Sequence, residues 1–256
     1  MKTQWDYTEL APAYLKRPDY SGEAIDEILR ITGTGPGSAV CDVGAGVAHL
    51  TLMLLAHGMT VTAVEPNDAM REGGEERTNG SGGVTWHEAT GEDTGQPSAA
   101  FDLVTFGSSF NVTDRRKALA ESHRILKPGG WFACLWNHRD LSDPIQSTIE
   151  GIIFNAVPDY RYGTRRKDQS GIIAESGLFD SAKSIEGNIR HLVAIDDCIR
   201  AWRSHATLQR QTGERFHEVV DTIAAFLKLT GKSKIEVPYT THGWVARKRG
   251  KASLKS

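Results

Sequence analysis

Short apolar runs alternate with segments of helical periodicity through most of this 256-residue chain, and this alternation restricts the folds it can adopt. The run AVCDVG at 39–44 is largely apolar, as expected of a strand that is covered on both faces. Strand-like segments that alternate with helix-like segments predict a parallel sheet with crossover helices. The predicted strands lie at 39–44, 60–65, 84–89, 101–106, 131–136, 184–193 and 234–247.

The predicted helices connect these strands and dominate the later part of the chain. They lie at 21–32, 46–57, 67–77, 114–126, 144–156, 195–205 and 214–229. The KPGG segment at 127–130 is predicted as a turn, and the last strand alternates in a way that suits an antiparallel strand at or near the sheet edge. The fold class is therefore α/β: a Rossmann-like, doubly wound, mostly parallel seven-stranded sheet with an antiparallel last strand and a helical lid or insertion.

Charge and cysteine content limit the classes of partner. The formal net charge is −2 and basic residues are spread along the chain, which predicts no nucleic-acid or anionic-membrane partner. The run Arg165-Arg166-Lys167 is interpreted as a solvated face. Three cysteines without a CxxC pair indicate neither a disulfide framework nor a zinc site. Because no segment has the pattern of a signal peptide or a membrane span, we expect a cytoplasmic protein.

The segment AVCDVGAGVAHL carries the first sign of a ligand site. A buried strand ends near Asp42, and Gly44 and Gly46 then permit a tight turn into a helix, where bare backbone N–H groups can approach a ligand closely. Dinucleotide-binding enzymes use the same turn, but His49 occupies the position of their third glycine.

Glu65 stands at the end of the second predicted strand, beside the glycine turn in a parallel sheet. A carboxylate at this place can accept hydrogen bonds from both hydroxyls of a ribose. The turn and the carboxylate together fit either a nicotinamide-dependent dehydrogenase or an S-adenosylmethionine enzyme.

Four segments, in order and spacing, resemble the type 11 group of class I S-adenosylmethionine-dependent methyltransferases. They are VCDVGAGVAHLT, VTAVEPNDAM, ATGED with FDLVTFGSSF, and ALAESHRILKPGGWFACLWNHRD. The leader APAYLKRPDY at 11–20 also looks like the N-terminal cover segment of that group. The resemblance covers about residues 7–140. It implies transfer of a methyl group from S-adenosyl-L-methionine, leaving S-adenosyl-L-homocysteine, to a small-molecule acceptor through oxygen, nitrogen or carbon.

The resemblance implies cofactor contacts in the leader and in the four segments. Those near the methionine part and its carboxylate are Tyr14, Arg17, Asp42, Gly44, Ala45 and Gly46. Those near the ribose and the adenine are Glu65, Pro66, Met70, Gly91 and Glu92. Those in the turn beneath the sulfonium are Phe106, Gly107 and Ser108.

The acceptor side is predicted at the carboxyl edge of the sheet, where ligands bind in open α/β folds. His138, which follows the fifth predicted strand, is the candidate general base. The residues predicted to shape the acceptor pocket are Phe110, Asn111, Trp136, Arg139 and Tyr160. For Arg139 the competing interpretation is a salt bridge with its neighbour Asp140.

One domain in four parts follows from this interpretation. The parts are a cover segment at 1–32, a cofactor-binding core at 33–140, substrate-selecting lid helices with one strand at 141–233, and the final strand at 234–247. Three alternatives remain open: a nicotinamide-dependent oxidoreductase, a methyltransferase-like regulator that binds the cofactor without activity, and a nucleic-acid methyltransferase. Histidines and carboxylates do not cluster at ligand spacings, so no metal site is predicted, and oligomeric state is left open.

Overall fold

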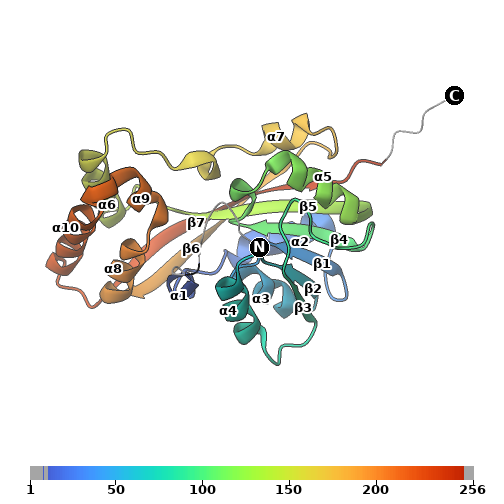
Figure 1. Cartoon of the computed structure of the whole chain (residues 1–256), viewed down its shortest axis with the longest axis horizontal. Helices are drawn as coiled ribbons and strands as arrows, with labels where there is room; N and C mark the ends of the chain where they lie inside the picture. The colour runs from blue at the N-terminus through green and yellow to red at the C-terminus, as the bar shows by residue number, and fades with distance from the viewer. Residues whose placement is uncertain (1–7, 9–10, 251–256) are drawn as a thin grey trace.

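A seven-stranded sheet forms the centre of the computed structural model, which describes residue 8 and residues 11–250 (Figure 1). Its order is β3-β2-β1-β4-β5-β7-β6. The strands are β1 (Ala39–Val43), β2 (Thr60–Val64), β3 (Val84–His87), β4 (Phe101–Gly107), β5 (Leu126–Arg139), β6 (Lys183–Ala194) and β7 (Lys234–Arg247). The first five are parallel, and β7 pairs antiparallel with β5 and β6. The predicted fold class is confirmed, with the antiparallel last strand one position in from the edge.

Helices cover both faces of the sheet and gather at one end of its long strands (Figure 1). The first helices are α1 (Ala11–Tyr14), α2 (Gly22–Thr32), α3 (His49–Ala56), α4 (Asp68–Thr78) and α5 (Arg115–Ile125). The later ones are α6 (Pro144–Ala156), α7 (Ser170–Glu175), α8 (Ile195–Arg203), α9 (Ala206–Thr212) and α10 (Phe216–Leu229). Short 3₁₀ segments are η2 (Phe110–Val112), η3 (Gly163–Arg166) and η4 (Gly213–Arg215).

Two predicted boundaries differ from the structure for backbone reasons. The helix expected from Gly46 begins at His49, because Gly44, Gly46 and Ala48 have φ values of 67°, 57° and 70°, which no right-handed helix accepts. The KPGG segment lies inside β5 as an irregularity of the strand. There the partners on β4 shift register between Phe101 and Leu103, and Gly129 takes φ 77°.

Each face of the sheet is buried under its own helices. On one face, Phe106, Phe110, Phe132 and Phe179 pack together and against α5 and α7. On the other, residues of β1, β2 and β4 pack against α2 and α3 in a separate cluster that includes Leu103. This explains why β1 is largely apolar, since both of its faces are covered.

A third apolar cluster lies where the long strands β6 and β7 extend beyond the rest of the sheet, at the left of Figure 1. Ile149 of α6, Trp202 of α8 and Ile223 of α10 pack there against Val237 of β7. Among the described residues, no helix has the length and apolar content needed to cross a bilayer. The first part of the expected cover segment, residues 1–7 and 9–10, lies outside the described residues.

Candidate active site

One cavity of about 800 Å³ opens at the carboxyl ends of β1, β2 and β4, where a parallel α/β sheet usually binds its ligand. The leader at 13–20 lines one side of it, and α8, with the adjoining ends of β6 and β7, lines another. Of the residues predicted for the site, its walls contain Tyr14, Arg17, Asp42, Gly44, Ala45, Gly46, Glu65, Pro66, Met70, Gly91, Glu92, Gly107, Ser108, Asn111, His138 and Arg139. The fold therefore brings most of the predicted residues to one cavity.

The glycine turn after β1 is held from both neighbouring strands. The N–H groups of Gly44 and Ala45 donate to the carbonyl of Val64, at 2.7 and 3.1 Å. Ser109, beyond the end of β4, donates its hydroxyl to the carbonyl of Val43 at 2.5 Å. A Cβ atom on Gly44 would lie 2.4 Å from the Cβ of Ser109. Only a residue without a side chain lets these segments meet and leaves bare backbone along the cavity.

The Glu65 carboxylate is fixed beside that turn. Its Oε2 accepts the Gly46 N–H at 2.9 Å and its Oε1 accepts the Asn67 N–H at 2.9 Å. The residue is only 7% exposed, and burial raises the pKa of its carboxyl. Each oxygen keeps acceptor capacity after its one backbone bond. The arrangement can receive two hydroxyl donors without rearrangement.

Asp42 lies in the cavity wall with its carboxylate already engaged. It is fully buried, and it accepts the hydroxyls of Thr51 at 2.7 Å and Thr105 at 2.8 Å. Burial raises the pKa of Asp42 to about 6, although the two hydroxyls act against that shift. The side chain thus ties α3 and β4 to β1 beneath the cavity.

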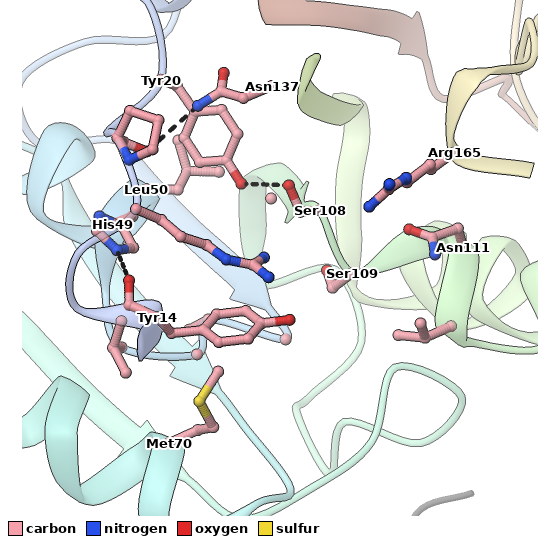
Figure 2. Close-up of a pocket in the computed structure, with 18 of the residues that line it drawn as sticks. Tyr14, Tyr20, His49, Leu50, Met70, Ser108, Ser109, Asn111, Asn137 and Arg165 are labelled. Atoms are coloured by element: carbon pink, nitrogen blue, oxygen red, sulfur yellow. Dashed lines mark hydrogen bonds between the residues drawn. The ribbon is translucent and has the colours of Figure 1, made fainter. Parts of the chain in front are cut away.

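The turn after β4 meets the leader through a tyrosine that the sequence patterns missed. Ser108 has φ 61°, unusual for a residue with a side chain, and its Oγ lies 2.9 Å from the Tyr20 hydroxyl (Figure 2). A Cβ on Gly107 would lie 2.9 Å from the same hydroxyl, so this glycine makes room for Tyr20. In the sequence, only the position of Tyr20 at the end of the leader could have indicated that it reaches the site.

The leader is fastened over the cavity by polar contacts. His49 contacts the Tyr14 carbonyl at 2.8 Å and the Asp19 carboxylate at 2.6 Å, and this bond lowers the pKa of Asp19 (Figure 2). Asn137 donates its amide to the Asp19 carbonyl at 3.0 Å. The Arg17 guanidinium carbon lies 3.6 Å from the centroid of the Tyr14 ring. These contacts place Tyr14 and Arg17 along the cavity.

Four aromatic residues predicted for the site do not line the cavity. Phe106 and Phe110 are fully buried in the sheet core, with ring centroids 5.4 Å apart. Trp136 faces the same core and reaches the site only through its Nε1, which donates to the Asn111 side-chain oxygen at 2.7 Å. Tyr160 packs in the helical cluster. Burial of their large apolar rings stabilises the core, so these side chains point into the core although they lie near strand ends.

His138 lines the cavity in a setting that keeps it neutral. Its Nε2 lies 3.1 Å from the Arg165 carbonyl, which can only accept, so the proton is assigned to Nε2 and the lone pair to Nδ1. Burial, followed by the charge of Arg166, lowers the pKa of His138 to about 4. The ring also lies 5.3 Å from that of His242.

Arg139 has a different partner from the one expected. Its guanidinium pairs with Glu150 of α6 at 2.7 Å and donates to Gln146 at 3.0 Å. Asp140 instead accepts from the backbone and hydroxyl of Ser142, at 2.9 and 2.6 Å. The expected pair with Asp140 is therefore wrong, because consecutive residues at a strand end point in opposite directions.

The interpretation of Arg165-Arg166-Lys167 as a solvated face is wrong for its first two members. Arg165 and Arg166 are half-buried and line the cavity, whereas Lys167 is exposed. His205 also lines it, stacked on Trp202 with ring centroids 5.2 Å apart. No residue pattern distinguished these side chains, since the distant chain segments that form the cavity decide their exposure. Within the described residues, no group of three His, Cys, Asp or Glu side chains could hold a metal ion.

Comparisons with known proteins agree with this geometry. Residues 41–134 match the family described as a methyltransferase domain. The chain is similar to the ubiquinone/menaquinone biosynthesis C-methyltransferase UbiE of Psychromonas ingrahamii, with 31% identity over 50% of this chain and 53% of that protein. It is similar to the same enzyme of Vibrio vulnificus, with 30% identity over 50% and 52%. The chain spans about half the length of these curated relatives.

Two solved structures share the fold over most of the chain. The YcgJ protein of Bacillus subtilis superposes with a TM-score of 0.56 at 17% identity, over 89% of this chain and 98% of that one. A phosphoethanolamine N-methyltransferase 2 of Haemonchus contortus, in complex with S-adenosyl-L-methionine, superposes with a TM-score of 0.55 at 15% identity, over 94% of this chain and 56% of that one. At these identities the likeness concerns the fold.

Proposed function

Because this chain belongs to the class I S-adenosylmethionine-dependent methyltransferases, we propose that it transfers a methyl group from S-adenosyl-L-methionine to oxygen, nitrogen or carbon of a small-molecule acceptor. The observation that carries the proposal is the Glu65 carboxylate, held by two backbone N–H groups at 2.9 Å beside the bare glycine turn. A cavity of about 800 Å³ leaves room for an acceptor beside the cofactor.

The residues of the cavity fit that cofactor chemically. Glu65 has spare acceptor capacity for two ribose hydroxyls, and the buried Met70 offers an apolar surface to a base. Gly44 and Gly46 let the methionine part lie against backbone. Arg17, beside Tyr14 in the leader, is assigned the cofactor carboxylate, with which a guanidinium forms strong paired hydrogen bonds.

When bound, S-adenosylmethionine supplies an electrophilic methyl group, so the protein must align a nucleophile with it, exclude water and manage one proton. The leader, fastened by Asn137 and His49, covers the cavity and excludes water. Asn111 is oriented by the Trp136 N–H at 2.7 Å and presents its amide beside the acceptor. His138 accepts the proton at Nδ1 when the acceptor has one to lose.

The proposal is tested by calorimetry with S-adenosylhomocysteine on the wild type and on Glu65→Gln. A glutamine keeps one acceptor oxygen but turns its NH₂ group toward the other backbone N–H, and it removes a charged acceptor from the ribose. Two charge-assisted hydrogen bonds at about 1.5–3 kcal/mol each predict at least ~10²-fold weaker binding. Glu175→Gln, an exposed position on α7, is the matched control and should bind as the wild type does.

The remaining candidates give different results in the same assays. Binding of NADH in place of S-adenosylhomocysteine would contradict the proposal and indicate an oxidoreductase. Tight binding of the adenosyl ligand, with no labelled methyl transferred to any member of an acidic, neutral and basic metabolite panel, would instead indicate a regulator that binds without activity.

A further inference from the structure

Arg165 is a cation that has no counterion among the described residues. It comes from η3, is half-buried in the cavity wall, and its Nε is buried with no hydrogen-bond partner. Within the part of the chain that the structure describes, its guanidinium forms no ion pair. Its guanidinium carbon lies 5.6 Å from the centroid of the Tyr162 ring. An unpaired charge in such a place costs folding free energy unless a ligand compensates it.

The charged groups around Arg165 increase this cost. The cations that act on it are Arg17, Arg139 and Arg166, and burial together with these charges lowers the pKa of Arg165. Of these three arginines, Arg139 is the one that forms an ion pair within the described residues, with Glu150. Burial, followed by the charges of Arg165, Arg139 and Arg17, lowers the pKa of His205 to about 3. His205 is therefore neutral, and the arginines alone make this side of the cavity positive.

The acidic residues of the cavity wall are engaged elsewhere. Asp42 and Glu65 are hydrogen-bonded at the cofactor side. Asp197 pairs with Arg200, and Glu92 accepts the Asp114 backbone N–H at 2.6 Å. The Asp114 carboxylate itself accepts the Lys117 backbone N–H at 3.2 Å. No carboxylate of the described chain therefore neutralises Arg165, and an anion has to come from outside the protein.

Figure 2 shows the Arg165 side chain reaching into the cavity, with its guanidinium end directed toward the space between Ser108 and Asn111. We propose that Arg165 binds an oxyanion on the methyl acceptor, a carboxylate or a phosphate, so that the substrates of this protein are small anionic molecules. This inference rests on the proposed function, because it assigns the acceptor of the same cavity. A guanidinium matches both anions through paired hydrogen bonds.

The position of Arg165 indicates that the anion belongs to the acceptor and not to the cofactor. The leader already offers Arg17 at the Tyr14 side of the cavity. Arg165 instead lies beside the candidate base, since its backbone carbonyl accepts from His138. An anion bound there would hold the acceptor near His138 and offset part of the positive charge that lowers the pKa of that histidine.

The experiment uses the full chain saturated with S-adenosylhomocysteine and measures binding of four probes by calorimetry. Benzoate represents a carboxylate and phenyl phosphate a phosphate, with benzamide and phenol as uncharged counterparts. Arg165→Gln is compared with Arg161→Gln, an exposed arginine of the same segment that lies outside the cavity. We expect at least one anion to bind the wild type and Arg161→Gln and to bind Arg165→Gln about tenfold or more weakly, with S-adenosylhomocysteine affinity unchanged.

Other outcomes overturn the inference in distinguishable ways. Binding of S-adenosylhomocysteine with no anion binding, or with anion binding that Arg165→Gln leaves intact, refutes an anionic acceptor while the proposed function stands. A large loss of S-adenosylhomocysteine affinity in Arg165→Gln assigns this arginine to the cofactor instead. Failure of the wild type to bind S-adenosylhomocysteine removes the proposed function and the inference together. A ligand-free Arg165→Gln that melts well below the wild type would indicate a structural role, because loss of an unpaired charge should not destabilise the fold.

Discussion

The close approach of Gly44 to Ser109 gives a sharp test of how the glycine turn is built. In Gly44→Ala the new Cβ would lie 2.4 Å from the Ser109 Cβ and 2.8 Å from its Oγ, on a backbone with φ 67°. Gly46→Ala introduces a Cβ at φ 57°, but its nearest neighbour is the flexible end of Met70 at 3.3 Å. The two variants share the conformational strain, and only the first adds a steric overlap.

The expected losses of unfolding free energy follow from these terms. A left-handed conformation costs a residue with a side chain about 1–2 kcal/mol, so Gly46→Ala should lose about that much. The overlap in Gly44→Ala adds about 1–3 kcal/mol of overpacking, for a total of about 2–5 kcal/mol. Displacing Ser109 also shifts the turn, so S-adenosylhomocysteine binding should be lost in Gly44→Ala and only weakened in Gly46→Ala.

Urea unfolding and calorimetry measure both effects, and Ser109→Gly completes a double-mutant cycle. Ser109→Gly removes the atoms that a Cβ on residue 44 would overlap, so the double variant should lose less stability than the two single variants added together. The reasoning is refuted if Gly44→Ala costs no more than Gly46→Ala, or if the two changes at 44 and 109 are additive.

Two further predictions concern buried charge. Burial raises the pKa of Asp42 from 3.8 to about 6. The stability gained by protonating Asp42 is therefore fully present below pH ~4 and is lost as the pH rises through 6. A shift of one pKa unit corresponds to about 1.4 kcal/mol. Between pH 4 and 7, the unfolding free energy of Asp42→Asn in urea should therefore rise by about 3 kcal/mol relative to that of the wild type. A difference between the two proteins that does not change with pH would contradict this. Arg139→Gln removes the cation that pairs with buried Glu150, leaving the Tyr162 hydroxyl as a donor to its carboxylate, and should cost about 3–5 kcal/mol of unfolding free energy. Arg190→Gln, in an exposed pair, should cost under about 1 kcal/mol, and equal losses would disprove the distinction.

Local periodicity predicted the order of the seven strands and of the longer helices, but it missed the short helices α1, α7 and α9. The helix at 144–156 was predicted with the bounds that α6 has, because Asp143 caps its first N–H groups and Pro144 starts it. The strand at 234–247 likewise has the bounds of β7. The helix after the glycine turn starts later than predicted, since the left-handed φ of Ala48 has no sequence signature.

The glycine turn and Glu65 could be placed from sequence because parallel strands bring their carboxyl ends together whatever the rest of the chain does. Periodicity and these two features were therefore sufficient to predict the sheet and the cofactor half of the cavity. Contacts between distant segments instead set the contact of Tyr20 with Ser108, the partner of Arg139 and the burial of Arg165. Periodicity depends on neighbours along the chain, whereas the exposure and the counterion of a side chain depend on segments that become neighbours only when the chain folds.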